Sequence, residues 1–364
     1  MHRNKTPRNR LDKSMAEMLT SEKLAIRIVI CLAVLVVVMA LCTLTGKIHL
    51  PEGSRKISLE KVFAGPGQKP GENIDYEIFV GVRLPRVILA ALVGAALACS
   101  GVILQAILRN PLADPYILGI SSGAGLGVIT AVISGITWSF WAGSPMAVFA
   151  FAGALGTVWL VWFIGRFTGK SQVTSLLLAG VVINAFFSAV IMFLTSIAKS
   201  DQLRLTIFWL MGNITEKSLS VLAVSAACIL AGIFALFCIS HRLNVLTLGQ
   251  EEAKGLGVDT TRTRAAAFGF AAFITAVAVS LSGLVGFVGL IIPHGVRLIF
   301  GPDHRQLLPL SGIIGGIFLV IADTLARTVF GQEQLPVGVI TAIAGGPFFL
   351  FLLAKYSRKV SWLK

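Results

Sequence analysis

Two glycine-bounded stretches contain residue types that are typical of nucleotide binding or catalysis. The first, GRFTGKS at 165–171, ends on Gly-Lys-Ser like a phosphate-binding loop, in which backbone N–H groups and the lysine hold phosphates. Its glycines are one residue too close for that motif, the run VWLVWFI precedes it, and no acidic metal-binding strand follows. We therefore expect this chain to bind no ATP, and interpret Arg166 and Lys170 as the positive end of a membrane helix.

The second stretch, GISSG, fits the G-x-S-x-G pattern of a nucleophilic serine. Ser121 could form the dyad of an intramembrane serine protease with His294 on another helix. However, Gly119 and Gly123 are four residues apart, which is the spacing that lets two membrane helices approach closely. We therefore favour helix packing over catalysis.

The composition indicates that lipid surrounds most of this chain. Hydrophobic residues make up 55% of its 364 residues and charged residues 13%, whereas soluble proteins have roughly 25% charged residues. The net charge of +14 lies mostly in tails and short loops, a pattern of membrane topology, so we expect no nucleic-acid partner. The five cysteines fall in apolar runs without a CxxC pair, and we expect no metal site.

Ten apolar runs predict an all-α, polytopic membrane protein with about ten transmembrane helices, since roughly 20 apolar residues cross a bilayer. A basic tail, 1–23, precedes the transmembrane domain, 24–354, and a short tail, 355–364, follows it. The predicted spans lie near residues 24–46, 86–108, 118–136, 145–168, 174–197, 218–240, 266–284, 287–300, 309–330 and 336–354.

The lysines and arginines favour an orientation with both termini in the cytoplasm. With ten spans, 20 of the 31 basic residues lie in inside segments, whereas nine spans would leave the basic C-terminal tail outside. The loop 47–86 lies outside in this arrangement, despite its seven basic residues. The apolar piece 205–214 is too short to cross, and we expect an interfacial or re-entrant helix on the outer side, with Trp209 at the headgroup level.

Two polar clusters flank the second predicted span. In RLPR, at its outer end, Arg83 and Arg86 either anchor the helix at the interface or contact a partner with acidic groups. At the inner end, Asn110 and Pro111 break the helix, and Asp114 is placed to cap the next one. For this inner cluster we favour a structural role.

The longest inside loop, 248–264, is predicted to contain two short helices. Residues 250–255 can make one or two helical turns that end at glycine, and Asp259 can cap a second short helix. With Leu256 and Val258 between them, such helices suit a groove on a soluble partner. The alternative is an ordinary solvated loop.

Ionisable residues also occur within or beside the last spans, in PHGVR and ADTLAR. Pro293 lies in a short span that also carries His294 and Arg297. Asp323 and Arg327 are spaced i,i+4 on the ninth span and can pair. Ionisable groups at such depth are functional candidates by default, although His294 equally fits a satisfied core histidine.

Together these clusters resemble the permease family of ABC importers for iron-siderophores, haem and cobalamin (type II importers). The likeness covers about residues 80–354, and its motifs keep the same order and spacing throughout. The motifs are RLPR (83–86), GAALACSGVILQAILRNPLADPYILGISSGAGLG (94–127), LLLAG (176–180), LGQEEAKGLGV (248–258), GFVGLIIPHGVRLIFGPDHRQLLP (286–309), ADTLAR (322–327) and LPVGVITAIAGGPFFLFLL (335–353).

The resemblance implies a transporter subunit of a bacterial or archaeal inner (plasma) membrane that does no covalent chemistry. Such permeases pair as a homodimer or with a sister subunit around one pathway. Two separate ATPase subunits, which hold ATP and Mg²⁺, bind below, and a periplasmic or extracellular binding protein delivers the chelate from outside. No cofactor is expected on this chain.

The resemblance also assigns roles to residues. It implies salt bridges from Arg83, Arg86 and Arg327 to acidic groups of the binding protein. It implies a cytoplasmic gate at Val173 and Thr174, and we guess that Asn184, Phe187 and Met192 line the pathway. The loop that couples to the ATPase then contains Gln250, Glu251, Glu252, Ala253, Gly255, Leu256 and Gly257.

We expect an iron(III)-siderophore as the cargo, then haem, then cobalamin, with molybdate a distant fourth. A rival interpretation is an ion-coupled secondary transporter, which would need intramembrane carboxylates to carry the coupling ion. Apart from Asp323 near a helix end, the predicted spans contain almost none. We therefore favour the ATP-driven importer.

Overall fold

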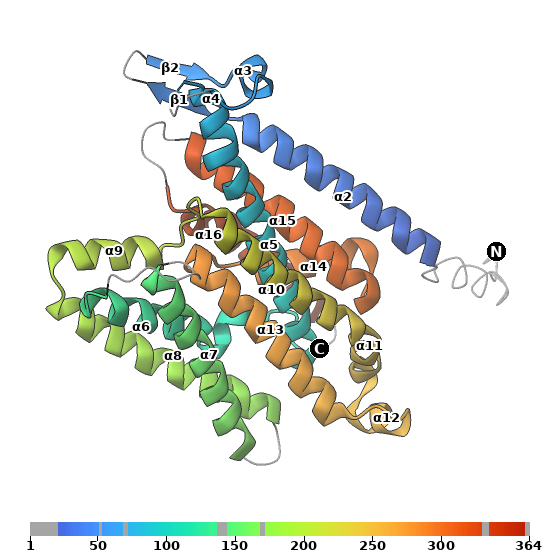
Figure 1. The fold of residues 1–364 in the computed structure, drawn as a ribbon. Helices are drawn as coiled ribbons and strands as arrows, with labels where there is room; N and C mark the ends of the chain where they lie inside the picture. Colours follow the sequence, from blue (N-terminus) through green and yellow to red (C-terminus); the bar gives the residue numbers. More distant parts are fainter. Residues whose placement is uncertain are drawn as a thin grey trace.

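The computed structural model describes residues 21–50, 53–67, 72–136, 144–167, 172–329 and 335–360, which form a bundle of helices (Figure 1). The longer helices are α2 (Ser21–Leu44), α5 (Leu84–Ile107), α7 (Pro145–Phe167), α8 (Gln172–Ile197), α10 (Leu219–Cys238), α13 (Thr260–Ser282), α15 (His304–Thr328) and α16 (Val337–Val360). The shorter ones are α3 (Leu59–Phe63), α4 (Ile74–Tyr76), α6 (Ile120–Ile133), α9 (Ser200–Leu210), α11 (Ser240–Leu248), α12 (Gln250–Gly255) and α14 (Val288–Phe300). A π-helical turn (Glu77–Arg83) leads into α5, and a 3₁₀ turn (Pro115–Leu118) precedes α6.

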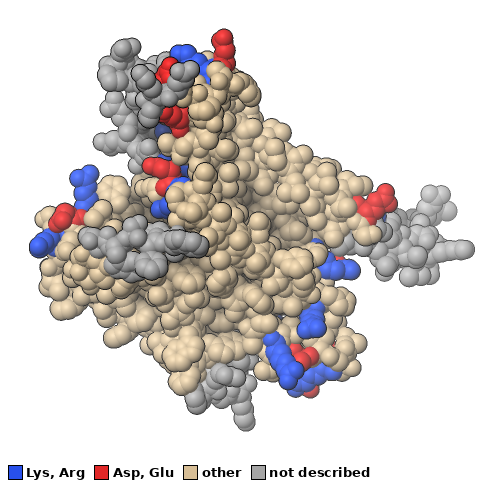
Figure 2. Space-filling model, viewed as in Figure 1, with Lys and Arg blue, Asp and Glu red and all other residues tan. Residues whose placement is uncertain are grey.

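The helices coincide with the ten predicted spans. Among the described residues, seven helices are long and apolar enough to cross a membrane, and α6, α14 and the first part of α16 are shorter apolar helices. Figure 2 shows charged side chains near the ends of the molecule, separated by a broad uncharged surface. The prediction of an all-α membrane fold is therefore confirmed.

Helix α5 forms the centre of the bundle. Helices α15, α13 and α14 pack against it, and the most apolar part of the continuous helical stretch Ile74–Ile107 is 83% buried. Glycines allow this closeness, because a Cβ atom at Gly94 would collide with the Gly315 carbonyl, and one at Gly101 with the Gly289 carbonyl. The polar groups at the two ends of α5 are consequently fixed by several helices at once.

Two helices lie at the edge of the bundle. Helix α2 runs along the outside of α15, and the apolar part of α2 has no buried fraction (Figure 1). The corresponding part of α8 is 22% buried. Apolar faces of this kind are suited to lipid or to another subunit, because water would not solvate them favourably.

The loop 47–86 contains structure that we did not predict; in the orientation that the basic residues favour, it lies at the outer end of the bundle and α12 lies at the inner end. Strands β1 (Lys47–Leu50) and β2 (Gly53–Lys56) pair as an antiparallel hairpin, in which Lys47 faces Lys56 and Leu50 faces Gly53. The sequence PEG at the connection is typical of a turn. A short helix is present where one was predicted, but with other bounds, because α9 begins at Ser200 and ends before Gly212, whose φ is +73°. Its position at the membrane interface stays a prediction.

The described parts of the two stretches that resembled catalytic motifs lie in helices or directly next to them. The run before GRFTGKS is the end of α7, a helix and not a buried strand, while Lys170 and Ser171 lie outside the described residues. In GISSG, a Cβ atom at Gly123 would strike Thr157 and the Gly153 carbonyl of α7. Close packing of α6 on α7 therefore accounts for this glycine.

Candidate functional site

The outer end of α5 carries a buried ion cluster centred on the Asp323 carboxylate of α15. Arg86 Nε lies 3.1 Å from both carboxylate oxygens, and Arg86 NH2 lies 2.9 Å from Oδ1. Arg327 Nε lies 3.3 Å from Oδ2, which confirms the predicted i,i+4 pair. The side chains of Arg86 and Asp323 are 5% and 1% exposed, and charges at such depth persist only when they are paired.

Arg83 and Arg327 fasten the outer end of α2. One terminal nitrogen of Arg83, NH1, donates to the carbonyls of Thr43, Leu44 and Thr45 at 3.1–3.4 Å, and the other donates to Gly46 at 3.0 Å. Arg327 NH2 donates to the Cys42 carbonyl at 3.2 Å. A cation at a helix C-terminus satisfies its free carbonyls and opposes the negative end of the helix dipole.

These contacts correct one interpretation of the outer arginines. Arg83 and Arg86 are only 6% and 4% exposed, so neither extends to the interface as an anchor. In this conformation they bind parts of the same chain, whereas contact with a binding protein needs their guanidinium groups at the outer surface. Their proposed role in docking is not tested by this geometry and stays a prediction.

At the opposite end, α11 and α12 form a short helical pair below the bundle (Figure 1). The predicted turns at Gln250–Gly255 are present as α12, and Gly257, with φ +78°, permits the chain to turn into α13. Ala253 is fully buried and fixes α12, whereas Leu256 is 64% exposed. The acidic side chains Glu251 and Glu252 are exposed as well.

The second short helix of this loop was predicted in the wrong place. The Asp259 side chain accepts a hydrogen bond from the Arg262 N–H at 2.9 Å, but the helix that it caps is the 23-residue α13. The second short helix is instead α11, which lies before α12. The cap was recognisable, but its sequence does not say how long the capped helix is, because apolar residues follow only after several polar ones.

Helix α8 presents the predicted gate and pathway residues at differing depths. Thr174 is exposed near the start of the helix, and Met192 is 71% exposed near its end. Asn184 and Phe187 are half-buried, with the Phe187 ring centre 5.9 Å from that of Phe186. Val173 lies in α8, but its side chain is outside the described residues. Their roles stay predictions.

Two polar residues for which sequence reasoning had little signal, Gln105 and Tyr116, connect the C-terminal end of α5 and the turn after it to α14 and the segment before it. Gln105 Nε2 donates to the carbonyls of Gly289 and Leu290 at 3.3 Å, and its Oε1 accepts from Arg297 at 2.9 Å. The Tyr116 hydroxyl donates to the Val285 carbonyl and accepts from its N–H, both at 3.0 Å. A lone amide in the apolar run VILQAIL was the available signal for Gln105.

The helix break and the cap predicted for the turn after α5 are present. Asn110 Oδ1 accepts from the Leu112 N–H and Asp114 Oδ1 from the Tyr116 N–H, both at 2.9 Å. Asp114 thereby caps the 3₁₀ turn Pro115–Leu118. Pro111 lies in the turn directly after Asn110, before the 3₁₀ turn. Pro293 and His294 are buried in α14.

Comparison with known proteins identifies this arrangement. The FecCD transport family matches residues 32–355. The chain belongs to the FecCD family. It is 44% identical to a cobalamin import system permease protein of Halobacterium salinarum over 285 residues, covering 76% of this chain and 73% of that one. It is 41% identical to a hemin transport system permease protein of Yersinia pestis, covering 79% and 86%.

A solved structure shares the fold of this FecCD chain. It is described as an inward-facing conformation of a metal-chelate type ABC transporter, with a TM-score of 0.77 and 30% identity, covering 90% of this chain and 98% of that one. The chain is thus an ABC importer permease, as its resemblance implied. The FecCD relatives are named as transporter permeases, in keeping with a role that is not enzymatic.

Proposed function

We propose that this FecCD permease forms, with a second permease subunit, the membrane pathway of an importer for a metal chelate, with an iron(III)-siderophore as the first candidate cargo. The family match over residues 32–355 is the observation that carries the proposal. Haem is the next candidate, and a relative named for hemin transport supports it. Cobalamin is the alternative favoured by a specific finding, the 44% identity to a cobalamin permease.

Two ATPase subunits would bind at the inner end through α12 and the turn that follows it. Support comes from the exposed Leu256 beside Glu251 and Glu252, held on a short helix whose Ala253 is anchored in the core. An apolar side chain ringed by charged ones suits a groove on a soluble protein. ATP-driven closure of the two ATPases would move α12, and α13, which follows it directly, would carry that movement into the bundle.

A binding protein would deliver the chelate at the outer end, near Arg83, Arg86 and Arg327. Support comes from the clustering of three arginines around Asp323 and the end of α2. Because these arginines bind their own chain here, docking through them requires a conformation in which acidic groups of the binding protein replace part of these contacts. Such an exchange would link docking to the state of the bundle, since linkage between two equilibria is reciprocal.

The pathway itself would lie along α8 between two copies of the chain. Support comes from the exposed apolar face of α8, which includes Phe186, Met192 and Phe193. Thr174 and Val173 would form the cytoplasmic gate at the start of this helix, and Asn184 and Phe187 would face the pathway further along. We place the chain in a bacterial or archaeal plasma membrane, with both termini in the cytoplasm.

Reconstituted transport tests the proposal. The chain would be purified with its ATPase and binding-protein partners and placed in liposomes that contain ATP. Uptake of radiolabelled iron(III)-siderophore is expected, and excess unlabelled haemin or cobalamin should compete weakly. Uptake of cobalamin but not of the siderophore would change the proposed cargo and leave the proposed importer intact. Uptake without the ATPase would contradict the proposed ATP-driven mechanism.

A further inference from the structure

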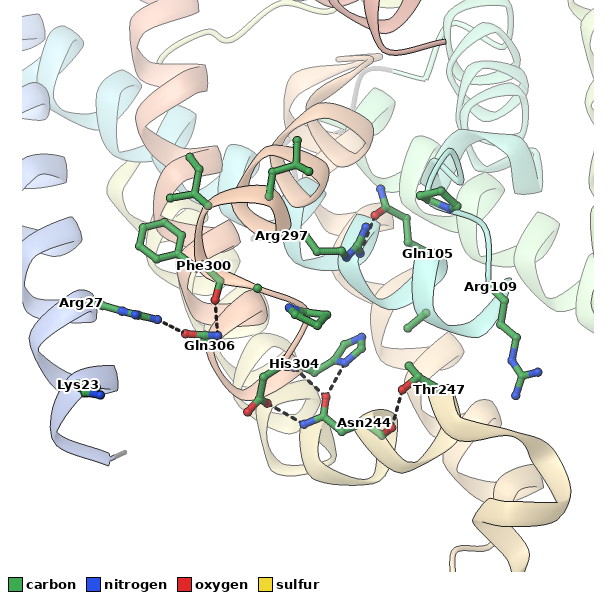
Figure 3. A pocket seen from close by; sticks show the side chains of 17 residues that line it. Lys23, Arg27, Gln105, Arg109, Asn244, Thr247, Arg297, Phe300, His304 and Gln306 are labelled. Carbon is green, nitrogen blue, oxygen red and sulfur yellow. Dashed lines mark hydrogen bonds between the residues drawn. The ribbon is translucent and has the colours of Figure 1, made fainter. Parts of the chain in front are cut away.

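A basic cavity lies at the inner end of the bundle, next to the start of α2. Its volume is about 1060 Å³, and its walls come from α2, the end of α5, α11 and the turn between α14 and α15. Figure 3 shows Arg27 reaching inward from α2, with Arg297 and Gln105 on the opposite wall. The cavity is separate from the outer ion cluster and from the exposed residues of α12.

The charged residues that line the cavity are mostly cations. They comprise Lys23, Arg27, Arg109 and Arg297, with Asp303 as the acid. The Asp303 carboxylate already accepts hydrogen bonds from Arg305, as short as 2.7 Å, and from Asn244 at 2.7 Å. The lining therefore carries a clear excess of positive charge, which attracts an anion.

Neighbouring groups hold the cations in place. Arg27 donates to Gln306 Oε1 at 2.6 Å, and Gln306 donates to the Phe300 carbonyl at 2.6 Å (Figure 3). Arg109 donates to the Leu246 carbonyl at 2.9 Å. A guanidinium has five N–H donors, and these bonds use one donor of Arg27 and one of Arg109, so both can still bind phosphate oxygens.

An apolar surface adjoins these cations. Leu298 and Ile299 line the same cavity and are 64% and 74% exposed, and the apolar part of α2, the helix that supplies Lys23 and Arg27, has no buried fraction. A free phosphate ion would gain nothing from these side chains. A ligand with a phosphate at one end and hydrocarbon at the other would cover both surfaces, as lipids do in basic pockets between membrane helices.

We propose that this cavity binds the headgroup of an anionic phospholipid. Its phosphate would contact Arg27, the other lining cations would add to the attraction, and its acyl chains would lie over Leu298, Ile299 and the exposed side of α2. The site would hold a lipid of the leaflet that faces the ATPase subunits. This proposal does not depend on the cargo or on transport, and its test uses the purified chain alone.

Lipid binding to the full-length chain in detergent tests the proposal, with native mass spectrometry and the thermal midpoint as readouts. Phosphatidylglycerol would be titrated against phosphatidylcholine with the same acyl chains, and inorganic phosphate forms a third arm. We expect phosphatidylglycerol to bind and to raise the midpoint. The double variant Lys23→Gln/Arg27→Gln should bind it about 25-fold more weakly, from about fivefold for each charge removed.

Two further variants control for charge and for folding. Arg27→Lys keeps the charge and should stay within a few-fold of the wild type. Arg242→Gln removes an exposed arginine of α11 that does not line the cavity, and should bind like the wild type. Arg27→Gln also loses the hydrogen bond to Gln306, so the rise of the midpoint with lipid is measured for each variant from its own midpoint without lipid.

Three results would overturn the assignment. Equal affinity for phosphatidylcholine would show that charge plays no part. Unchanged affinity for phosphatidylglycerol in the double variant would place the lipid elsewhere. Inorganic phosphate that raises the midpoint as much as phosphatidylglycerol does would make this a site for free anions.

Discussion

The outer ion cluster predicts an unequal response to the loss of its members. Asp323 is the shared counter-ion of two arginines, at 2.9 Å from Arg86 and 3.3 Å from Arg327. The variant Asp323→Asn keeps the shape of the side chain but leaves two buried guanidinium groups facing each other. The variant Arg86→Met, in contrast, leaves Asp323 and Arg327 as a neutral pair. We therefore expect Asp323→Asn to be the more damaging of the two.

The contacts set the expected loss of unfolding free energy for each variant. Loss of one partner from a buried ion pair costs about 3–5 kcal/mol, so we expect about 4 kcal/mol for Asp323→Asn. Loss of charge-assisted hydrogen bonds costs about 1.5–3 kcal/mol, so we expect about 2 kcal/mol for Arg86→Met. The double variant removes the opposed charges together, and with a coupling of up to about 3 kcal/mol it should lose about 3 kcal/mol instead of about 6 kcal/mol.

Thermal unfolding in detergent, followed by tryptophan fluorescence, measures these differences. At about 2 °C for each kcal/mol, Asp323→Asn should lower the midpoint by about 8 °C, Arg86→Met by about 4 °C and the double variant by about 6 °C. Arg204→Met, on the exposed surface of α9, is the control and should shift it by about 1 °C or less. A double variant that loses about 12 °C, the sum of the two single variants, would refute the coupling, and equal single variants would refute the asymmetry.

Three other predictions concern the inner loop, the core and the turn before α15. Leu256→Asp should abolish co-purification of the ATPase without changing the thermal midpoint, while Leu219→Asp, equally exposed at the outer end, should retain the ATPase. Gly101→Ala should cost at least about 3 kcal/mol and most of the folded yield, because its Cβ atom would strike the Gly289 carbonyl. Gly156→Ala, whose methyl group meets open space, should keep the wild-type yield. Burial acts to raise the pKa of Asp303, but hydrogen bonds from Arg305 and Asn244 outweigh it and lower the pKa to about 2. The Asp303 carboxylate should therefore add about 1–2 kcal/mol to the free energy of unfolding above pH 4, and this contribution is lost as the pH falls to about 2. The difference in stability between the wild type and Asp303→Asn should accordingly vanish in acid.

The fold was predictable because apolar length alone decides which segments cross lipid. Even the short α14, which contains Pro293, was predicted as a span, because only ten spans place the basic C-terminal tail on the same side as most other lysines and arginines. Helix ends were less certain, since α13 begins at Thr260, six residues before its apolar run. The Asp259 cap extends that helix beyond the hydrophobic stretch, and hydropathy does not register polar helical turns.

The site was predictable in its residue types but not in its partnerships. The pairing of Asp323 with Arg327 follows from helical periodicity, so a local pattern contained it. The stronger contact of Asp323, with Arg86, joins residues 237 positions apart, and no local pattern contains that information. Arg83 was misplaced for the same reason, because its acceptors are carbonyl groups at the end of another helix.

Helix α15 is the element that joins the two ends of the candidate site. At its inner end, His304 contacts Asn244 of α11. The backbone N–H of His304 donates to Asn244 Oδ1 at 2.8 Å, and its ring nitrogen Nδ1 lies 2.7 Å from the same oxygen. At its outer end Asp323 holds Arg86, nineteen residues and thus about 28 Å further along the helix. Between these two ends α15 packs closely against α5, and a Cβ atom at Gly315 would strike the Gly94 carbonyl. The two helix backbones are therefore in direct contact there. We therefore propose that a shift of α11 would reach Arg86 and Arg327 along α15, which would let binding-protein docking and ATPase movement influence each other.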